Sequence, residues 1–98
     1  MEAGMIKNML MRLVVIKREV SKLRIECLKK NYENVGELLE HVQVLQNEES
    51  MIIDQLDCKE LVNYYEDYKD TLTKSELEVF SRVLMELHVK KINEERGR

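Results

Sequence analysis

The sequence predicts an all-α fold: a single domain over residues 1–98, built as a four-helix bundle that begins with a long antiparallel helical hairpin. The chain has no proline, only 3 glycines and 5% aromatic residues, so it lacks the turn residues and the composition of β-sandwiches and barrels. Its 44% hydrophobic and 36% charged content is that of a folded domain rather than a disordered tail. A domain of this size holds one small core, which predicts modest stability.

The first helix is predicted over residues 3–30. Its apolar residues recur at alternating spacings of three and four, which places them on one stripe of a helix. The stripe consists of Ile6, Met9, Leu13, Ile16, Val20, Leu23 and Cys27. Leu10, Met11, Val14 and Val15 add apolar surface outside this stripe, so the stretch from Met9 to Ile16 is apolar around nearly its whole circumference.

The second helix is predicted over residues 33–56, where a stripe with the same spacings is displaced by one residue from the first. Asn34, followed three residues later by Glu37, is typical of a helix start. So short a connection predicts that the first two helices are antiparallel neighbours. Glu49 interrupts the stripe, either as a register-setting polar residue in a helical seam or as a solvent-facing residue. The stripe reads Val35, Leu38, Val42, Leu45, Glu49, Ile52 and Leu56.

Two shorter segments complete the bundle. A third helix is predicted over residues 58–71, with Asp57 and Glu60 at its start. A fourth is predicted over residues 74–95, where Thr73 and Glu76 form a Thr-x-x-Glu capping box. The apolar stripes are Cys58, Leu61, Tyr65, Tyr68 and Leu72 in the third helix, and Leu77, Phe80, Leu84 and Leu87 in the fourth.

Charge is distributed unevenly along the chain. Residues 1–30 carry eight Lys or Arg and three Glu, residues 31–78 carry three Lys and thirteen acids, and residues 79–98 carry five Lys or Arg and three Glu. The net charges of these segments are +5, −10 and +2, which add to −3 for the chain. This asymmetry predicts that a basic first helix lies against an acidic second helix.

The sequence does not indicate an enzyme, because no nucleophile, acid/base or phosphate-binding motif occurs at a recognised spacing. Cys27, His41, Cys58 and His88 supply the number of ligands for a zinc site, but not the short local spacings that such sites use, so we expect neither a metal nor another cofactor. The longest apolar run, Leu13–Ile16, is far too short to cross a membrane. We therefore expect a cytoplasmic protein without a disulfide framework, a secretory signal or a membrane contact.

The function that these features predict is a non-enzymatic protein-binding module, acting as a chaperone, adaptor or regulator that captures a partner helix. The surplus of apolar residues in the first helix and the tyrosine cluster of the third suggest where another protein binds. The candidate partner-binding residues are Met9, Leu10, Leu13, Val14, Tyr64 and Tyr68. The alternative is that these side chains simply fill the centre of the bundle. We expect a homodimer or a constitutive complex with a partner, because long heptad stripes are satisfied by a second chain as readily as by a hairpin.

Two segments resemble known families. Residues 28–39 (LKKNYENVGELL) and 52–56 (IIDQL) resemble the small all-helical flagellar export chaperones of the FlgN and FliT type. This resemblance implies a cytoplasmic binding protein that holds a partner's helix in an apolar groove. Residues 72–80 (LTKSELEVF) resemble the opening of the helix-turn-helix in LuxR-type and phage transcription regulators.

The second resemblance supports an alternative function, a DNA-binding or transcription-regulating protein of phage origin. The basic first segment and Lys90, Lys91, Arg96 and Arg98 would contact the DNA. The acidic middle segment and the absence of aromatic residues between the N-terminal Lys and Arg disfavour nucleic acid as the partner.

Overall fold

The computed structural model of the chain describes residues 2–29 and 35–97 and confirms the all-α fold. The elements are α1 (Ala3–Lys29), α2 (Val35–Gln55), α3 (Cys58–Tyr68), the short 3-10 helix η1 (Lys69–Thr71) and α4 (Lys74–Arg96). The predicted bounds of the first and fourth helices agree with these to within one residue. The third helix ends earlier than predicted, because its last turn tightens into η1. The predicted helix start at Asn34 lies outside the described residues.

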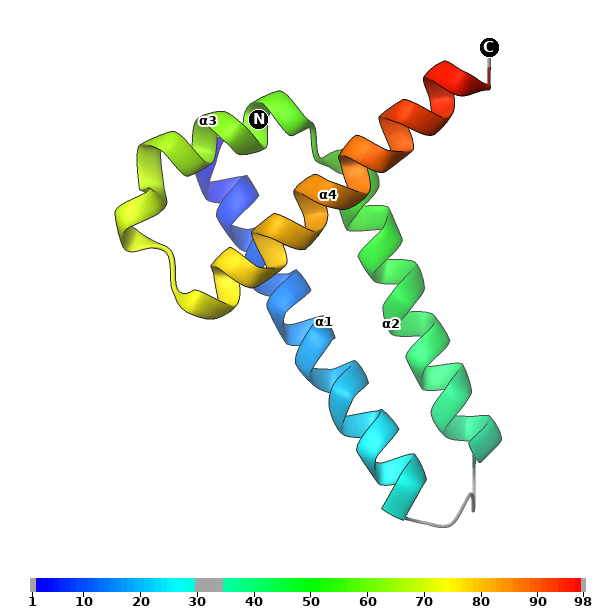
Figure 1. The fold of residues 1–98 in the computed structure, drawn as a ribbon. Coiled ribbons are helices and arrows are strands. Elements are labelled where there is room, and N and C mark those ends of the chain that lie inside the picture. Colours follow the sequence, from blue (N-terminus) through cyan, green and yellow to red (C-terminus); the bar gives the residue numbers. More distant parts are fainter. Residues whose placement is uncertain (1, 30–34, 98) are drawn as a thin grey trace.

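Helices α1 and α2 form the predicted hairpin, and α4 crosses it (Figure 1). The chain passes from α2 through α3 and η1 to reach the start of α4, and α3 lies beside the N-terminal half of α1 (Figure 1). Because α4 crosses the hairpin at an angle, the closed end of the hairpin extends beyond α4 on one side. The C-terminal part of α4 extends past α2 on the other side (Figure 1).

The molecule is flat and more open than most domains of its length. Its Cα atoms span 45 × 39 × 18 Å, and since packed helix axes lie about 8–10 Å apart, the shortest dimension holds two layers of helices. The radius of gyration is 15.7 Å, against about 13 Å for a compact domain of 100 residues. Two layers that cross obliquely therefore leave part of each layer uncovered.

Both predicted side-chain caps in the described chain are formed. The Asp57 carboxylate accepts a hydrogen bond of 3.3 Å from the backbone N–H of Glu60 at the start of α3. The Thr73 hydroxyl accepts one of 3.2 Å from the N–H of Glu76 and donates one of 3.2 Å to the Glu76 carboxylate. These caps satisfy N–H groups that have no partner within the helix, and they fix where α3 and α4 begin.

Replacement of Thr73 with alanine is expected to lower the free energy of unfolding by about 1 kcal/mol, because the Glu76 N–H loses its acceptor. Urea denaturation followed by circular dichroism measures this change. Ser81→Ala, at an exposed position inside α4, is the control and is expected to change stability by less than about 0.5 kcal/mol. Equal stabilities of the two variants would contradict a capping role for Thr73.

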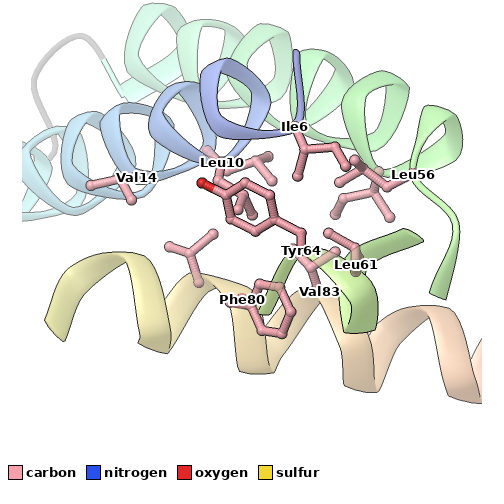
Figure 2. Packing of buried hydrophobic residues seen from close by; sticks show 11 residues of the cluster. Ile6, Leu10, Val14, Leu56, Leu61, Tyr64, Phe80 and Val83 are labelled. Carbon is pink, nitrogen blue, oxygen red and sulfur yellow. The ribbon is translucent and has the colours of Figure 1, made fainter. Parts of the chain in front are cut away.

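The buried side chains fall into two groups that follow each other along α1. The larger group, which we call the crossing cluster, joins α1 to α3, α4 and the end of α2 (Figure 2). The smaller group, the hairpin cluster, joins only α1 and α2. The crossing cluster consists of Ile6, Leu10, Leu13, Val14, Ile53, Leu56, Leu61, Tyr64, Val79, Phe80 and Val83. The hairpin cluster consists of Ile16, Val20, Leu23 and Leu45.

Two predicted stripes need correction. In α3 the buried tyrosine is Tyr64, whereas Tyr65 and Tyr68 are about two-fifths exposed, because the helix turns the i+3 neighbour of Leu61 inward rather than the i+4 neighbour. In α4 the buried residues are Val79, Phe80 and Val83. The predicted Leu77, Leu84 and Leu87 are only partly buried at the edge of that face.

Ion pairs tie the two layers together more than they tie α1 to α2. Glu49, which interrupts the predicted stripe of α2, is partly buried, and its carboxylate accepts a hydrogen bond of 2.7 Å from Arg82 of α4. Asp54 pairs with Lys90 of α4 at 2.8 Å. Among the described residues, the predicted attraction between a basic α1 and an acidic α2 is limited to the pair formed by Arg12 and Glu48.

Candidate partner-binding surface

The residues predicted to contact a partner do not form one surface. Leu10 and Leu13 are fully buried, Val14 and Tyr64 are nearly so, and all four belong to the crossing cluster (Figure 2). Met9 is partly buried against the same cluster. In this respect the structure agrees with the alternative reading, in which the apolar surplus lies at the centre of the bundle. Tyr68 is partly exposed and lies against Tyr64, with a ring-centroid distance of 4.8 Å.

Burial has a chemical consequence at Tyr64. Desolvation of its phenolic group raises the pKa, and the nearby carboxylate of Glu76 raises it further. Both effects disfavour a phenolate. Tyr64 is therefore a neutral residue at the edge of the core.

Exposed apolar side chains occur on all four α-helices, and three of them lie in the part of the hairpin farthest from α3 (Figure 1). We call this region the distal arm, and it comprises residues 16–29 of α1 and 35–45 of α2. The body of α4 does not cover it (Figure 1). Ile25, Leu28 and Leu39 are 52%, 67% and 59% exposed there. The arm thus presents apolar surface that has no cover within the described chain.

Helical periodicity places these residues on the same side of the hairpin as the crossing cluster. Leu28 follows Leu10 by 18 residues, which is about five full turns, so the two side chains share one face of α1. Leu39 precedes Ile53 of the crossing cluster by 14 residues, about four turns of α2. The face that α3 and α4 cover at one end of the hairpin therefore continues uncovered along the distal arm.

A groove of about 400 Å³ lies where this open face meets the start of α4. Its apolar lining comes from Val14 and Ile25 of α1 and Val79 of α4. The polar lining consists of Lys17, Arg18, Ser21, Lys22, Ser75 and Glu78. A side chain of a partner that entered this groove would extend the crossing cluster toward the distal arm.

The cations around the groove are weakly engaged within the chain. Lys17 pairs with Glu78 at 3.3 Å, but Arg18 contacts only the neutral hydroxyl of Ser75, at 3.5 Å. Lys22 lies 3.9 Å from Glu19 on its own helix. Arg24 and Lys29, further along α1, form no ion pair with any residue that the structure describes. Positive charge on the distal arm is therefore largely available to a ligand.

On the other side of the hairpin the charged side chains of α1 and α2 are paired with each other near the middle of the hairpin. Arg12 donates two hydrogen bonds to Glu48, one of them 2.7 Å from Nη2 to Oε1. Hydrogen bonding by the guanidinium lowers the pKa of Glu48, and the same bond raises the pKa of Arg12. A carboxyl whose pKa is lower in the folded state stabilises the fold above its unfolded pKa, and this contribution is lost as pH falls through the folded value.

We therefore expect Glu48 to titrate at a lower pH in the wild-type protein than in Arg12→Ala, where the carboxylate loses its partner. NMR titration of the side-chain carboxyl carbons measures the difference. Lys22→Ala, which removes an exposed cation of α1 that does not contact Glu48, is the matched control and should leave the pKa of Glu48 as in the wild type. An unchanged pKa of Glu48 in Arg12→Ala would contradict the ion pair.

Other predicted features are placed as follows. Cys27 and Cys58 are partly buried free thiols, and His41 and His88 are exposed. The described residues contain no group of three His, Cys, Asp or Glu side chains arranged to hold a metal ion. They also contain no helix that is long and apolar enough to span a bilayer.

The phrase that resembles a helix-turn-helix opening begins a single helix. From Thr73 the chain runs without interruption through α4 to Arg96. The turn and the second helix that follow this phrase in transcription regulators are therefore not formed in the described part of the chain. Lys90, one of the candidate DNA contacts, is bound to Asp54, and this bond raises its pKa.

Sequence reasoning missed Ile25, Leu28 and Leu39 because they lie outside the stripes that join α1 to α2. The sequence signal that could have found them is their spacing: Leu28 and Leu39 lie about a whole number of helical turns from Leu10 and Ile53.

Comparisons with protein-family models, with curated proteins and with solved structures found no match to this chain.

Proposed function

We propose that this chain is a non-enzymatic protein-binding module that holds a helix of another polypeptide on the distal arm, as a chaperone, adaptor or regulator does. The observation that carries this proposal is the uncovered apolar face of the arm, made by Ile25, Leu28 and Leu39. Monomeric proteins keep large contiguous apolar patches for interaction sites. A helix laid along this face would take the position that α4 occupies at the other end of the hairpin.

The surface area of the chain supports the same proposal. Its accessible surface is 7265 Å², whereas a compact monomer of 11.7 kDa exposes about 5,900 Å². The excess of roughly 1,400 Å² is larger than the surface of about 800 Å² that one partner contributes to a standard protein–protein interface. A homodimer or a constitutive complex with a partner would cover such an excess.

Light scattering at micromolar concentration tests the proposal, together with purification of the chain from its native host. We expect a particle mass above 11.7 kDa, from self-association or from a protein recovered in stoichiometric amount. The double variant Ile25→Ser/Leu28→Ser should abolish any association that uses the distal arm, and Met51→Ser should retain it. Met51 is as exposed as Leu28, at 67%, but lies on α2 away from the open face. A constant mass of one chain, with no stoichiometric partner, would overturn the proposal.

DNA binding is the second candidate function, and the observation that favours it is the positive charge of the distal arm. A mobility-shift assay at about 50 mM salt should then show a complex that is lost near 200 mM. Absence of a shift at micromolar protein and low salt would exclude this candidate.

A further inference from the structure

Where the open face of the distal arm meets the start of α4, its apolar residues are combined with an excess of positive charge. The α1 part of the arm carries five cations, three of which line the groove at the start of α4, and two carboxylates, Glu19 and Glu26. The α2 part of the arm carries Glu37 and Glu40, which do not line the groove. The only carboxylate that lines the groove at the start of α4 is Glu78. The cations are Lys17, Arg18, Lys22, Arg24 and Lys29.

We infer that the partner of this surface is an acidic amphipathic helix, an inference that rests on the proposed function. The apolar face of such a helix would cover Ile25, Leu28 and Leu39. Its carboxylates would pair with Arg18 and Lys22, which have no cross-helix carboxylate partner in the described chain. Complementary charge of this kind fixes the orientation of a bound helix and speeds its association.

The same charge argues against a second copy of the chain seated face to face on this surface. A twofold axis would bring two copies of the cationic face together, and like charges across an interface are unfavourable. The occupant is therefore of opposite charge. A self-associating chain would have to use another of its surfaces.

The apolar residues argue for a helix rather than for nucleic acid. Phosphate contacts are made by basic and polar side chains, and bases are stacked on aromatic rings. Ile25, Leu28 and Leu39 are aliphatic, and the first two lie among the cations of α1, which suits the apolar and charged positions of an amphipathic helix. No aromatic ring lines the groove at the start of α4.

Three synthetic peptides of about five helical turns, sharing one leucine face and differing only in a polar face of Glu, Gln or Lys, test the inference. Fluorescence anisotropy of each labelled peptide, titrated with the full chain, measures affinity. We expect the Glu peptide to bind at least about tenfold more tightly than the Gln peptide, and the Lys peptide not to bind. Binding of the Glu peptide should weaken as salt rises from about 50 to 200 mM.

Matched variants locate the binding. Arg18→Glu/Lys22→Glu should weaken the Glu peptide by at least about tenfold, whereas Lys59→Glu/Lys91→Glu, with the same charge change at exposed positions of α3 and α4, should not. Ile25→Ser/Leu28→Ser should weaken both the Glu and the Gln peptides, and Met51→Ser neither. Circular dichroism confirms that each variant is folded.

The outcomes separate the inference from the proposed function. Equal affinities for the Glu, Gln and Lys peptides, all lost in Ile25→Ser/Leu28→Ser, would overturn the acidic partner and leave helix binding intact. A labelled DNA duplex that binds while the Glu peptide does not would overturn it in favour of nucleic acid. If no peptide binds, the inference fails, and the proposed function is decided by light scattering and purification from the host.

Discussion

Truncation of Leu10 to alanine is expected to lower the free energy of unfolding by about 3 kcal/mol. Leu10 has no exposed surface and lies in the crossing cluster, where α1 meets α3 and α4 (Figure 2). The loss combines the transfer of buried methyl groups with the cavity that remains. A domain of about 100 residues has a total stability of only about 5–15 kcal/mol, so this one change removes a large fraction of it.

Urea denaturation measures the effect, and Met11→Ala is the matched control. Met11 is the next residue along α1 but is half-exposed, so its truncation should cost less than about 0.5 kcal/mol. Leu10→Glu should prevent folding altogether, since an unpaired carboxylate would be buried. A folded Leu10→Glu protein would show that this residue belongs to a binding surface rather than to the core.

Truncation of Phe80 to alanine is expected to have an effect of similar size, about 3–4 kcal/mol. Phe80 is buried on the inner face of α4, and its ring lies against Tyr65 of α3 with a centroid distance of 5.6 Å. The substitution removes the largest apolar side chain of α4 from the contact between the two layers. It should therefore loosen the packing of α3 and α4 on the hairpin.

Thermal unfolding and near-UV circular dichroism check this expectation, because the signal of Tyr65 depends on its fixed contact with the ring. Met85→Ala is the control on the same helix, where the side chain is 71% exposed and points away from the core. The control should retain both the melting temperature and the tyrosine signal. An unchanged signal in Phe80→Ala would contradict the packing of α4 described above.

Local sequence signals predicted the helices well, because each of these signals acts within a few residues. Asp57 and Thr73 fix two helix starts through hydrogen bonds to residues three positions ahead. The three-four stripe of α1 predicted its contact with α2, since an antiparallel neighbour runs along the whole helix.

The crossing of α4 over the hairpin was not predictable in the same way. Apolar residues occur around much of α4, so several stripes compete, and only the crossing angle selects Val79 and Val83 over Leu77 and Leu84. The pair formed by Glu49 and Arg82 depends on the same angle. The uncovered face of the distal arm was missed for this reason too. An apolar stripe on α1 or α2 does not show how much of its length α3 and α4 cover.

The division of buried residues into two clusters implies that α1 is not equally stable along its length. The hairpin cluster holds the distal arm through a single helix-to-helix contact, whereas the crossing cluster holds the other end through three. Local opening of the arm therefore requires less free energy than opening of the whole domain. Amide hydrogens near Leu23 then exchange with solvent by partial unfolding, and those near Leu10 only by global unfolding. A ligand bound to the arm would slow hydrogen exchange there first. Exchange rates at one end of α1 would therefore measure ligand binding, and those at the other end would measure the global stability of the fold.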